Sequence, residues 1–131
     1  MLTETTLGRI GEAALAGHQL RVPAHFDAEV YSALRRHRRM GGVTAARLDA
    51  LVSLLAEFTA QRVALSGLLV AAHGLGERFS SSDSLYVALS QLQRADLVTA
   101  DSALARAATG VIPVRLISPP SPAAPSSAPP S

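Results

Sequence analysis

Residues 80–108 read SSSDSLYVALSQLQRADLVTADSALARAA. The three serines ahead of Asp83 are residues that helices prefer at the N-cap. The apolar positions that follow share one helical face: Leu85, Ala88, Leu89 and Leu92. The triplet Leu97-Val98-Thr99 is typical of a short buried strand. A further helix then runs through Ala108, with Asp101 or Ser102 as its cap. This alternation of helix and strand indicates an α/β protein.

The same criteria predict further elements on both sides of this stretch. Helices are expected over Thr3–Ala16, from His25 to Gly41-Gly42, from Thr44 onward and over Leu68–His73, and strands over Gln19–Val22, Arg62–Leu65 and Val111–Ile117. The helix that begins at Thr44 is expected to bury a stripe made of Leu48, Leu51, Leu54, Leu55 and Phe58. Strands that alternate with helices are joined by crossovers and lie parallel, so we expect an α/β sandwich.

The composition fits one globular domain. The chain has 131 residues, of which 48% are hydrophobic and 17% charged, and a net charge of +2 that implies only weak attraction to polyanions. Residues 118–131 contain only Ser, Pro and Ala, so we expect a domain over residues 1–117 and a disordered tail. There is no cysteine, and we see neither a signal peptide nor an apolar run of membrane-spanning length. We therefore expect a cytoplasmic protein.

Three acids follow predicted strands, at the edge of a parallel sheet where ligands bind. Glu29 lies early in the helix after the Gln19 strand, Asp83 heads the helix after the serines, and Asp101 follows Thr99. Each acid also has an ordinary explanation, because a carboxylate stabilises a helix N-terminus by about 0.3–1 kcal/mol. Asp27 flanks the apolar face of its helix opposite Glu29, so spacing alone does not choose between these two acids.

Three carboxylates in one cleft would repel one another unless a divalent cation were bound between them. Oxygen ligands favour Mg²⁺ or Mn²⁺, and magnesium commonly binds one or two carboxylates together with substrate phosphates. We therefore expect a site that hydrolyses phosphodiester bonds, if the three acids meet.

The chain resembles a known family, the PIN-domain proteins of the VapC type, which are ribonuclease toxins of bacterial toxin–antitoxin pairs. The resemblance covers roughly residues 7–117. Its motifs are A-E-V at Ala28–Val30, D-x-L-Y-V-A-L at Asp83–Leu89 and V-T-A-D-x-x-L-A at Val98–Ala105, within the stretches VPAHFDAEVYSALRR at Val22–Arg36 and Ser80–Ala108.

The resemblance implies a fold, an activity and partners. It makes Glu29, Asp83 and Asp101 the metal-binding and catalytic acids, favours Glu29 over Asp27, and makes Thr99 and Ser102 lesser candidates. The implied fold is a three-layer α/β/α sandwich, and the implied activity is Mg²⁺-dependent endonucleolytic cleavage of RNA. The implied partners are a VapB-like antitoxin and a second copy of the chain in a homodimer.

The sequence departs from the family pattern at its start. Family members open with a strand that ends in an acid, whereas Met1–Ile10 reads MLTETTLGRI and is helix-like. Either the true start lies upstream or the chain is a truncated relic. If it is complete as given, we expect the first central strand and one metal ligand to be missing, and nuclease activity to be weak or absent. The alternative function is a catalytically impaired remnant that only binds the antitoxin.

Other patterns are less specific. Arg35, Arg36 and Arg39 could bind RNA phosphates, although a solvated helix face explains them slightly better. The four histidines lack zinc-ligand spacing, and Gly67–Gly76 lacks a phosphate-loop motif. Ser80–Ser82 shows no paired histidine and acid, which argues against a serine hydrolase. A DNA-binding helix over Arg35–Arg39 is a third possibility, but the flanking sequence does not support it.

Overall fold

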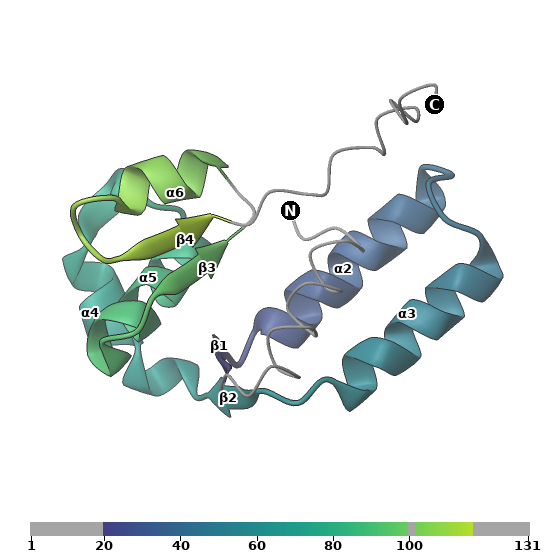
Figure 1. Cartoon of the computed structure of the whole chain (residues 1–131), viewed down its shortest axis with the longest axis horizontal. Helices are drawn as coiled ribbons and strands as arrows, with labels where there is room; N and C mark the ends of the chain where they lie inside the picture. Colours follow the sequence, from purple (N-terminus) through teal and green to yellow (C-terminus); the bar gives the residue numbers. More distant parts are fainter. Residues whose placement is uncertain (1–19, 100–101, 117–131) are drawn as a thin grey trace, which may run out of the picture.

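The computed structural model describes residues 20–99 and 102–116 (Figure 1). Along the chain it contains β1 (Arg21–Pro23), α2 (Phe26–Arg39), α3 (Ala45–Glu57), β2 (Gln61–Val63), a 3-10 turn (Leu65–Gly67), α4 (Leu69–Gly74), a second 3-10 turn (Gly76–Arg78), α5 (Ser81–Gln93), β3 (Leu97–Thr99), α6 (Ser102–Ala108) and β4 (Val114–Leu116). The helix expected over Thr3–Ala16 and the tail from Ser118 lie outside the described residues. None of the described helices is both long and apolar enough to cross a membrane.

The strands pair in parallel, which confirms that prediction. β1 lies beside β2, with Val22 opposite Arg62, and the α2–α3 pair forms the crossover between them. β3 lies beside β4, with Val98 opposite Arg115, and α6 forms that crossover. The expected single sheet is not formed by the described residues, which make two separate two-stranded ladders (Figure 1). Each ladder consists of the two strands that one helical crossover connects, and no described strand pairs with both β1 and β3.

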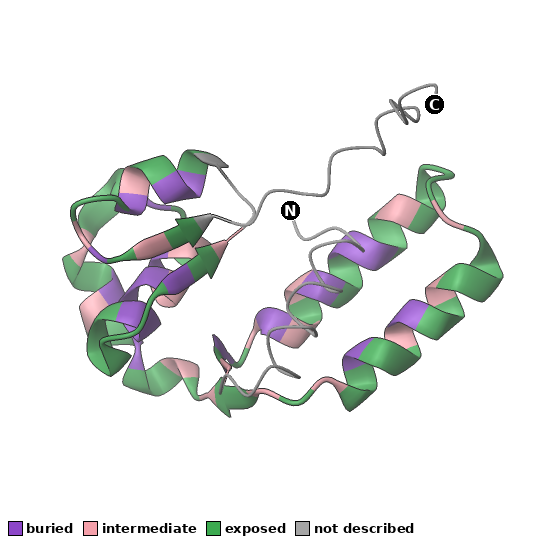
Figure 2. Cartoon of the chain, in the orientation of Figure 1, coloured by how far each residue is buried: buried purple, intermediate pink, exposed green. Residues whose placement is uncertain are grey.

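α2 and α3 pack against each other and against the start of β1. Their shared core cluster consists of Val22, Phe26, Val30, Leu34, Leu51 and Leu55, with Leu48 and Phe58 packed beside it. Thr44 caps α3 as predicted, accepting a hydrogen bond from the Arg47 backbone N–H at 3.1 Å. The assignment of Leu54 to the buried stripe is wrong, because its side chain is 52% exposed. Leu51 and Leu55 are the buried residues of α3, and most of the helix is exposed (Figure 2).

α5 contacts both ladders. It packs against α4, β1 and β3, and its Val87 and Ala88 are fully buried. Ser80 caps it as predicted, accepting from the Asp83 backbone N–H at 3.1 Å. Leu92 was expected on the buried face but is 54% exposed. It lies in the last turn of α5, and α4, which packs on this helix, has only six residues.

Candidate active site

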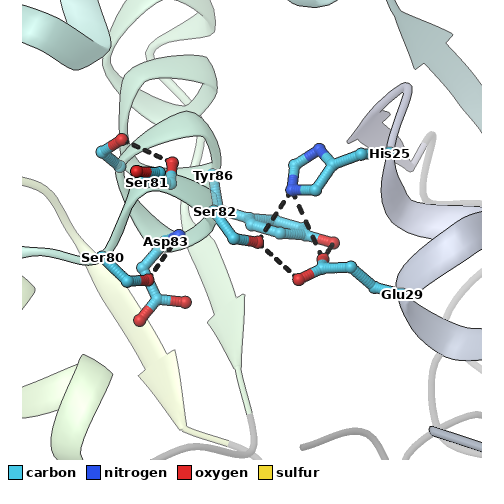
Figure 3. Close-up of polar contacts among 8 residues, drawn as sticks. His25, Glu29, Ser80, Ser81, Ser82, Asp83 and Tyr86 are labelled. Atoms are coloured by element: carbon cyan, nitrogen blue, oxygen red, sulfur yellow. Dashed lines mark hydrogen bonds and ion pairs between the residues drawn. The ribbon is translucent and has the colours of Figure 1, made fainter. Parts of the chain in front are cut away.

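β1 brings the first turns of α2 and α5 together, because α2 follows β1 in the chain and α5 packs against it. β1 ends at Pro23, and the Ala24 backbone N–H donates to the Val63 carbonyl at 2.9 Å, so the chain turns directly into α2. His25 and Glu29 then lie one turn apart at the start of α2. Because α5 packs against β1, its first turns face these two residues (Figure 3).

Four side chains from the two helices form a hydrogen-bonded group around the carboxylate of Glu29. The Tyr86 hydroxyl donates to Glu29 Oε1 at 2.6 Å, and the Ser82 hydroxyl donates to Glu29 Oε2 (Figure 3). His25 Nε2 lies 2.9 Å from Ser82 Oγ and 3.4 Å from Glu29 Oε1. The rings of His25 and Tyr86 are in contact, with centroids 5.1 Å apart. Glu29 is therefore held at both carboxylate oxygens.

This group corrects the expectation that the serine segment has no histidine and acid beside it. The tertiary structure brings His25 and Glu29 to Ser82. However, the single hydroxyl proton of Ser82 goes to Glu29, so its oxygen accepts from the Nε2–H of His25. In a serine hydrolase the histidine instead accepts the serine proton, and the acid binds the opposite ring nitrogen. The arrangement therefore does not activate Ser82 as a nucleophile.

Asp27 and Glu29, which spacing could not distinguish, have different surroundings. The two oxygens of Asp27 accept from Arg62 of β2, from Nε at 3.1 Å and from a terminal nitrogen at 2.8 Å. Arg62 also donates to the carbonyls of Phe58 and Ala60 at 2.9 Å each. Hydrogen bonding of the Arg62 guanidinium to the Asp27 carboxylate is the main cause that raises the pKa of Arg62. Asp27 is thus engaged in an ion pair on the β2 side, whereas Glu29 faces α5.

Asp83 follows Ser82, the residue of α5 whose hydroxyl donates to Glu29. Asp83 lies in the first turn of α5, as Ser82 does, and it is half-buried (Figure 3). The pKa of Tyr86 is strongly raised, first by burial, then by the hydrogen bond to Glu29, and then by the charges of Glu29, Asp83 and Asp27. The charges of all three acids in the first turns of α2 and α5 therefore act on this phenol, and only Glu29 accepts its hydrogen bond.

The structure describes two of the three expected acids. Glu29 and Asp83 lie at the facing starts of α2 and α5, but Asp101 lies outside the described residues, between the end of β3 and the start of α6. Among the described residues, no three histidine or acidic side chains group closely enough to hold a metal ion. The donors that are present, two carboxylates and the hydroxyl of Ser82, are the oxygen ligands that magnesium prefers. They fit the expected ion, and the complete three-acid site stays a prediction.

The arginines of α2 are exposed. Arg35, Arg36 and Arg39 have no ion pair with any acid in the part of the chain that the structure describes, although the Arg35 guanidinium lies over the Tyr31 ring at 5.6 Å. Arg36 follows Glu29 by seven positions, which places it on the same helix face, about 10 Å further along the axis. Arg36 therefore continues the helix face that begins at Glu29.

Sequence reasoning missed His25, Ser82 and Tyr86 as members of the site. A signal was available, because His25 and Glu29, and likewise Ser82 and Tyr86, are four positions apart and share helix faces. What the spacing could not indicate is that the two faces meet.

Two comparisons with known proteins bear on this site. The family model described as PIN domain matches residues 3–110, a range that includes both facing helix starts and Asp101. Ribonuclease VapC3 from Mycobacterium tuberculosis, strain CDC 1551 / Oshkosh, is 42% identical over 95 residues, covering 72% of this chain and 69% of the relative. Ribonuclease VapC3 of strain ATCC 25618 / H37Rv matches with the same identity and coverage.

Proposed function

This chain belongs to the PIN-domain family, and we propose that it is a VapC-type ribonuclease toxin whose metal-binding and catalytic acids are Glu29, Asp83 and Asp101. The observation that carries this assignment is the meeting of two helix starts from distant parts of the sequence. Ser82 and Tyr86 of α5 both donate to the carboxylate of Glu29 of α2, and Asp83 is the next residue after Ser82 on α5. Asp27, the competing acid, is bound to Arg62.

The metal chemistry follows from the donor set. Mg²⁺ or Mn²⁺ bound by these acids would polarise the scissile phosphate and lower the pKa of the attacking water. Glu29 suits the role of ligand because its side chain is 40% exposed although both of its oxygens are hydrogen-bonded to α5. Asp83 contributes a second carboxylate from the first turn of α5, and Asp101 follows β3 directly in sequence. Thr99, at the end of β3, and Ser102, at the start of α6, are the lesser candidates.

The arginine face of α2 supplies the substrate-binding surface in this proposal. Arg35, Arg36 and Arg39 offer guanidinium groups that bind phosphate oxygens in a two-pronged manner. Neutralising backbone phosphates releases counterions and provides affinity without base specificity. RNA bound along α2 would reach Glu29 from the side of Arg36.

We extend the proposal to the architecture. The two ladders belong to one three-layer α/β/α sandwich, because the single helix α5 packs on β1 as well as on β3. A further strand between β1 and β3, of the kind expected from the family, would join them into one sheet. The proposed assembly is a homodimer that a VapB-like antitoxin blocks at the acid site, in the bacterial cytoplasm.

Growth arrest in a bacterial host tests the function. Expression of the chain should arrest growth, and co-expression of its VapB-like antitoxin should relieve the arrest. Asp83→Ala should abolish toxicity, whereas Asp27→Asn should retain it, because both oxygens of Asp27 are bound by Arg62. A chain that binds the antitoxin but neither arrests growth nor cleaves RNA at matched expression would instead be a non-catalytic, antitoxin-binding module.

A further inference from the structure

We propose that Ser82, Tyr86 and His25 form a positioning cluster that holds the carboxylate of Glu29 in the orientation needed to bind a divalent cation. This inference rests on the proposed function, because it assigns Glu29 as a metal ligand. None of the three residues is proposed to touch the substrate or the reacting atoms. Their role is to set how tightly the site binds the metal.

The hydrogen bonds orient the carboxylate without using all of its lone pairs. An ionised carboxylate offers about four acceptor positions, and Tyr86 and Ser82 each occupy one, on different oxygens. The side chain of Glu29 is 40% exposed, whereas that of His25 is 18% exposed. The carboxylate is therefore fixed from its buried side, and its remaining lone pairs are accessible to a cation.

The donors are themselves anchored. Tyr86 packs against two core clusters, one centred on Phe26 and Val30 and the other on Val87 and Leu97, so its ring cannot move without disturbing both. Ser82 lies one turn before Tyr86 on α5, which gives the two hydroxyl groups a rigid separation along one helix face. Glu29 therefore gives up its side-chain freedom before a metal arrives, and a preorganised ligand binds more tightly than a mobile one.

His25 completes the cluster by orienting Ser82. Its Nε2–H donates to Ser82 Oγ at 2.9 Å, which leaves the serine proton directed at Glu29. Donors arranged in such a chain strengthen one another. The ring stays in this position although its buried Nδ1 has no hydrogen-bond partner among the described residues. This arrangement resembles the outer hydrogen bonds that orient metal ligands in other proteins.

Metal binding to the purified full-length chain tests the proposal, with Mn²⁺ alone as the probe and isothermal titration calorimetry as the measurement. Ser82→Ala and Tyr86→Phe should each weaken Mn²⁺ binding by about 10–100-fold. Ser82→Thr, which keeps the hydroxyl group, should recover most of the affinity. Two matched controls should bind within about two-fold of the wild type. Ser84→Ala removes a buried α5 hydroxyl that donates to the Ser81 carbonyl instead, and Tyr31→Phe removes the hydroxyl of an exposed phenol about 200° around α2 from Glu29.

Cleavage kinetics separate positioning from a general structural role. The metal concentration that gives half-maximal activity should rise in Ser82→Ala and Tyr86→Phe, while the KM for RNA stays unchanged and saturating Mn²⁺ restores kcat. A uniform loss of kcat at every metal concentration would contradict positioning. Circular dichroism confirms that each variant is folded before it is titrated.

Glu29→Gln distinguishes failure of this inference from failure of the proposed function. If Glu29→Gln abolishes Mn²⁺ binding while folded Ser82→Ala and Tyr86→Phe bind as the wild type does, only the positioning role is overturned. If the wild type does not bind Mn²⁺, or binds it equally well with Glu29→Gln, the metal site itself is wrong and the positioning cluster is rejected with it.

Discussion

The phenol oxygen of Tyr86 lies 2.6 Å from Glu29 Oε1, and the two residues are 57 positions apart in the sequence. This contact joins the start of α2 to the second turn of α5, and it places a carboxylate against a partly buried phenol. A glutamate in the first turn of a helix is commonly a solvated, weakly stabilising group. Here it is held from the protein side, as a metal ligand would need to be.

Tyr86 should make stability pH-dependent in the alkaline range. Its pKa in the folded state is raised above the ordinary value of 10.0 by burial and by the bond to Glu29. Above about pH 10 the unfolded chain has lost the phenol proton and the folded chain keeps it, so the free energy of unfolding falls as pH rises, by up to about 1.4 kcal/mol per pH unit. Below that pH the contribution is fully present. Urea unfolding from pH 8 to 11 should show a shallower decline for Tyr86→Phe, and parallel curves would contradict the assignment.

Asp27 and Glu29 should give opposite results when each is neutralised. Asp27→Asn removes a partly exposed ion pair with Arg62 and should cost about 0.5–1 kcal/mol of stability, with ribonuclease activity retained. Glu29→Gln should reduce ribonuclease activity by at least about 100-fold. The same variant should change the free energy of unfolding only slightly. Chemical denaturation and RNA cleavage, measured on the same preparations, provide the comparison. If the Asp27→Asn variant is folded but loses activity, Asp27 rather than Glu29 is the catalytic acid.

Arg36 and Arg38 provide a matched test of the RNA-binding face. Arg36 lies on the helix face of Glu29, whereas Arg38 lies on the opposite face and donates to the Val43 carbonyl at 3.4 Å. Arg36→Ala should weaken RNA binding and reduce the slope of log affinity against log salt by roughly one phosphate contact. Arg38→Ala should leave that slope unchanged. Fluorescence anisotropy with a labelled RNA at several salt concentrations measures the slope for each variant. Equal slopes in the two variants would show that the Arg36 face of α2 does not bind RNA.

Leu51 and Leu54 test the packing of α3. Leu51 is 2% exposed and belongs to the core cluster shared with α2, so Leu51→Ala should cost about 2–5 kcal/mol. Leu54 is 52% exposed, and Leu54→Ala should change stability by no more than about 0.5 kcal/mol. Thermal and urea unfolding of the two variants should therefore differ clearly. Similar losses would mean that a further element covers Leu54.

Much of the local structure could be predicted because it depends on neighbours in the chain. The strand Leu97–Thr99 and the caps at Thr44 and Ser80 agree with the structure, since apolar runs and capping hydroxyls act within a few residues. The exposure of Leu54 and Leu92 could not be predicted in this way. Helical periodicity defines a face, but the extent of burial depends on how much of that face a neighbouring helix covers.

The sequence by itself determined most of the helices and strands, to within a few residues of their observed ends, and that the strands pair in parallel through helical crossovers. Only the tertiary structure decided that Asp27 binds Arg62 while Glu29 meets Ser82, Tyr86 and His25. The physical reason is distance along the chain. Hydrogen bonds between residues 53 and 57 positions apart form only when two helices dock on the same strand, and that docking depends on the packing of the whole core.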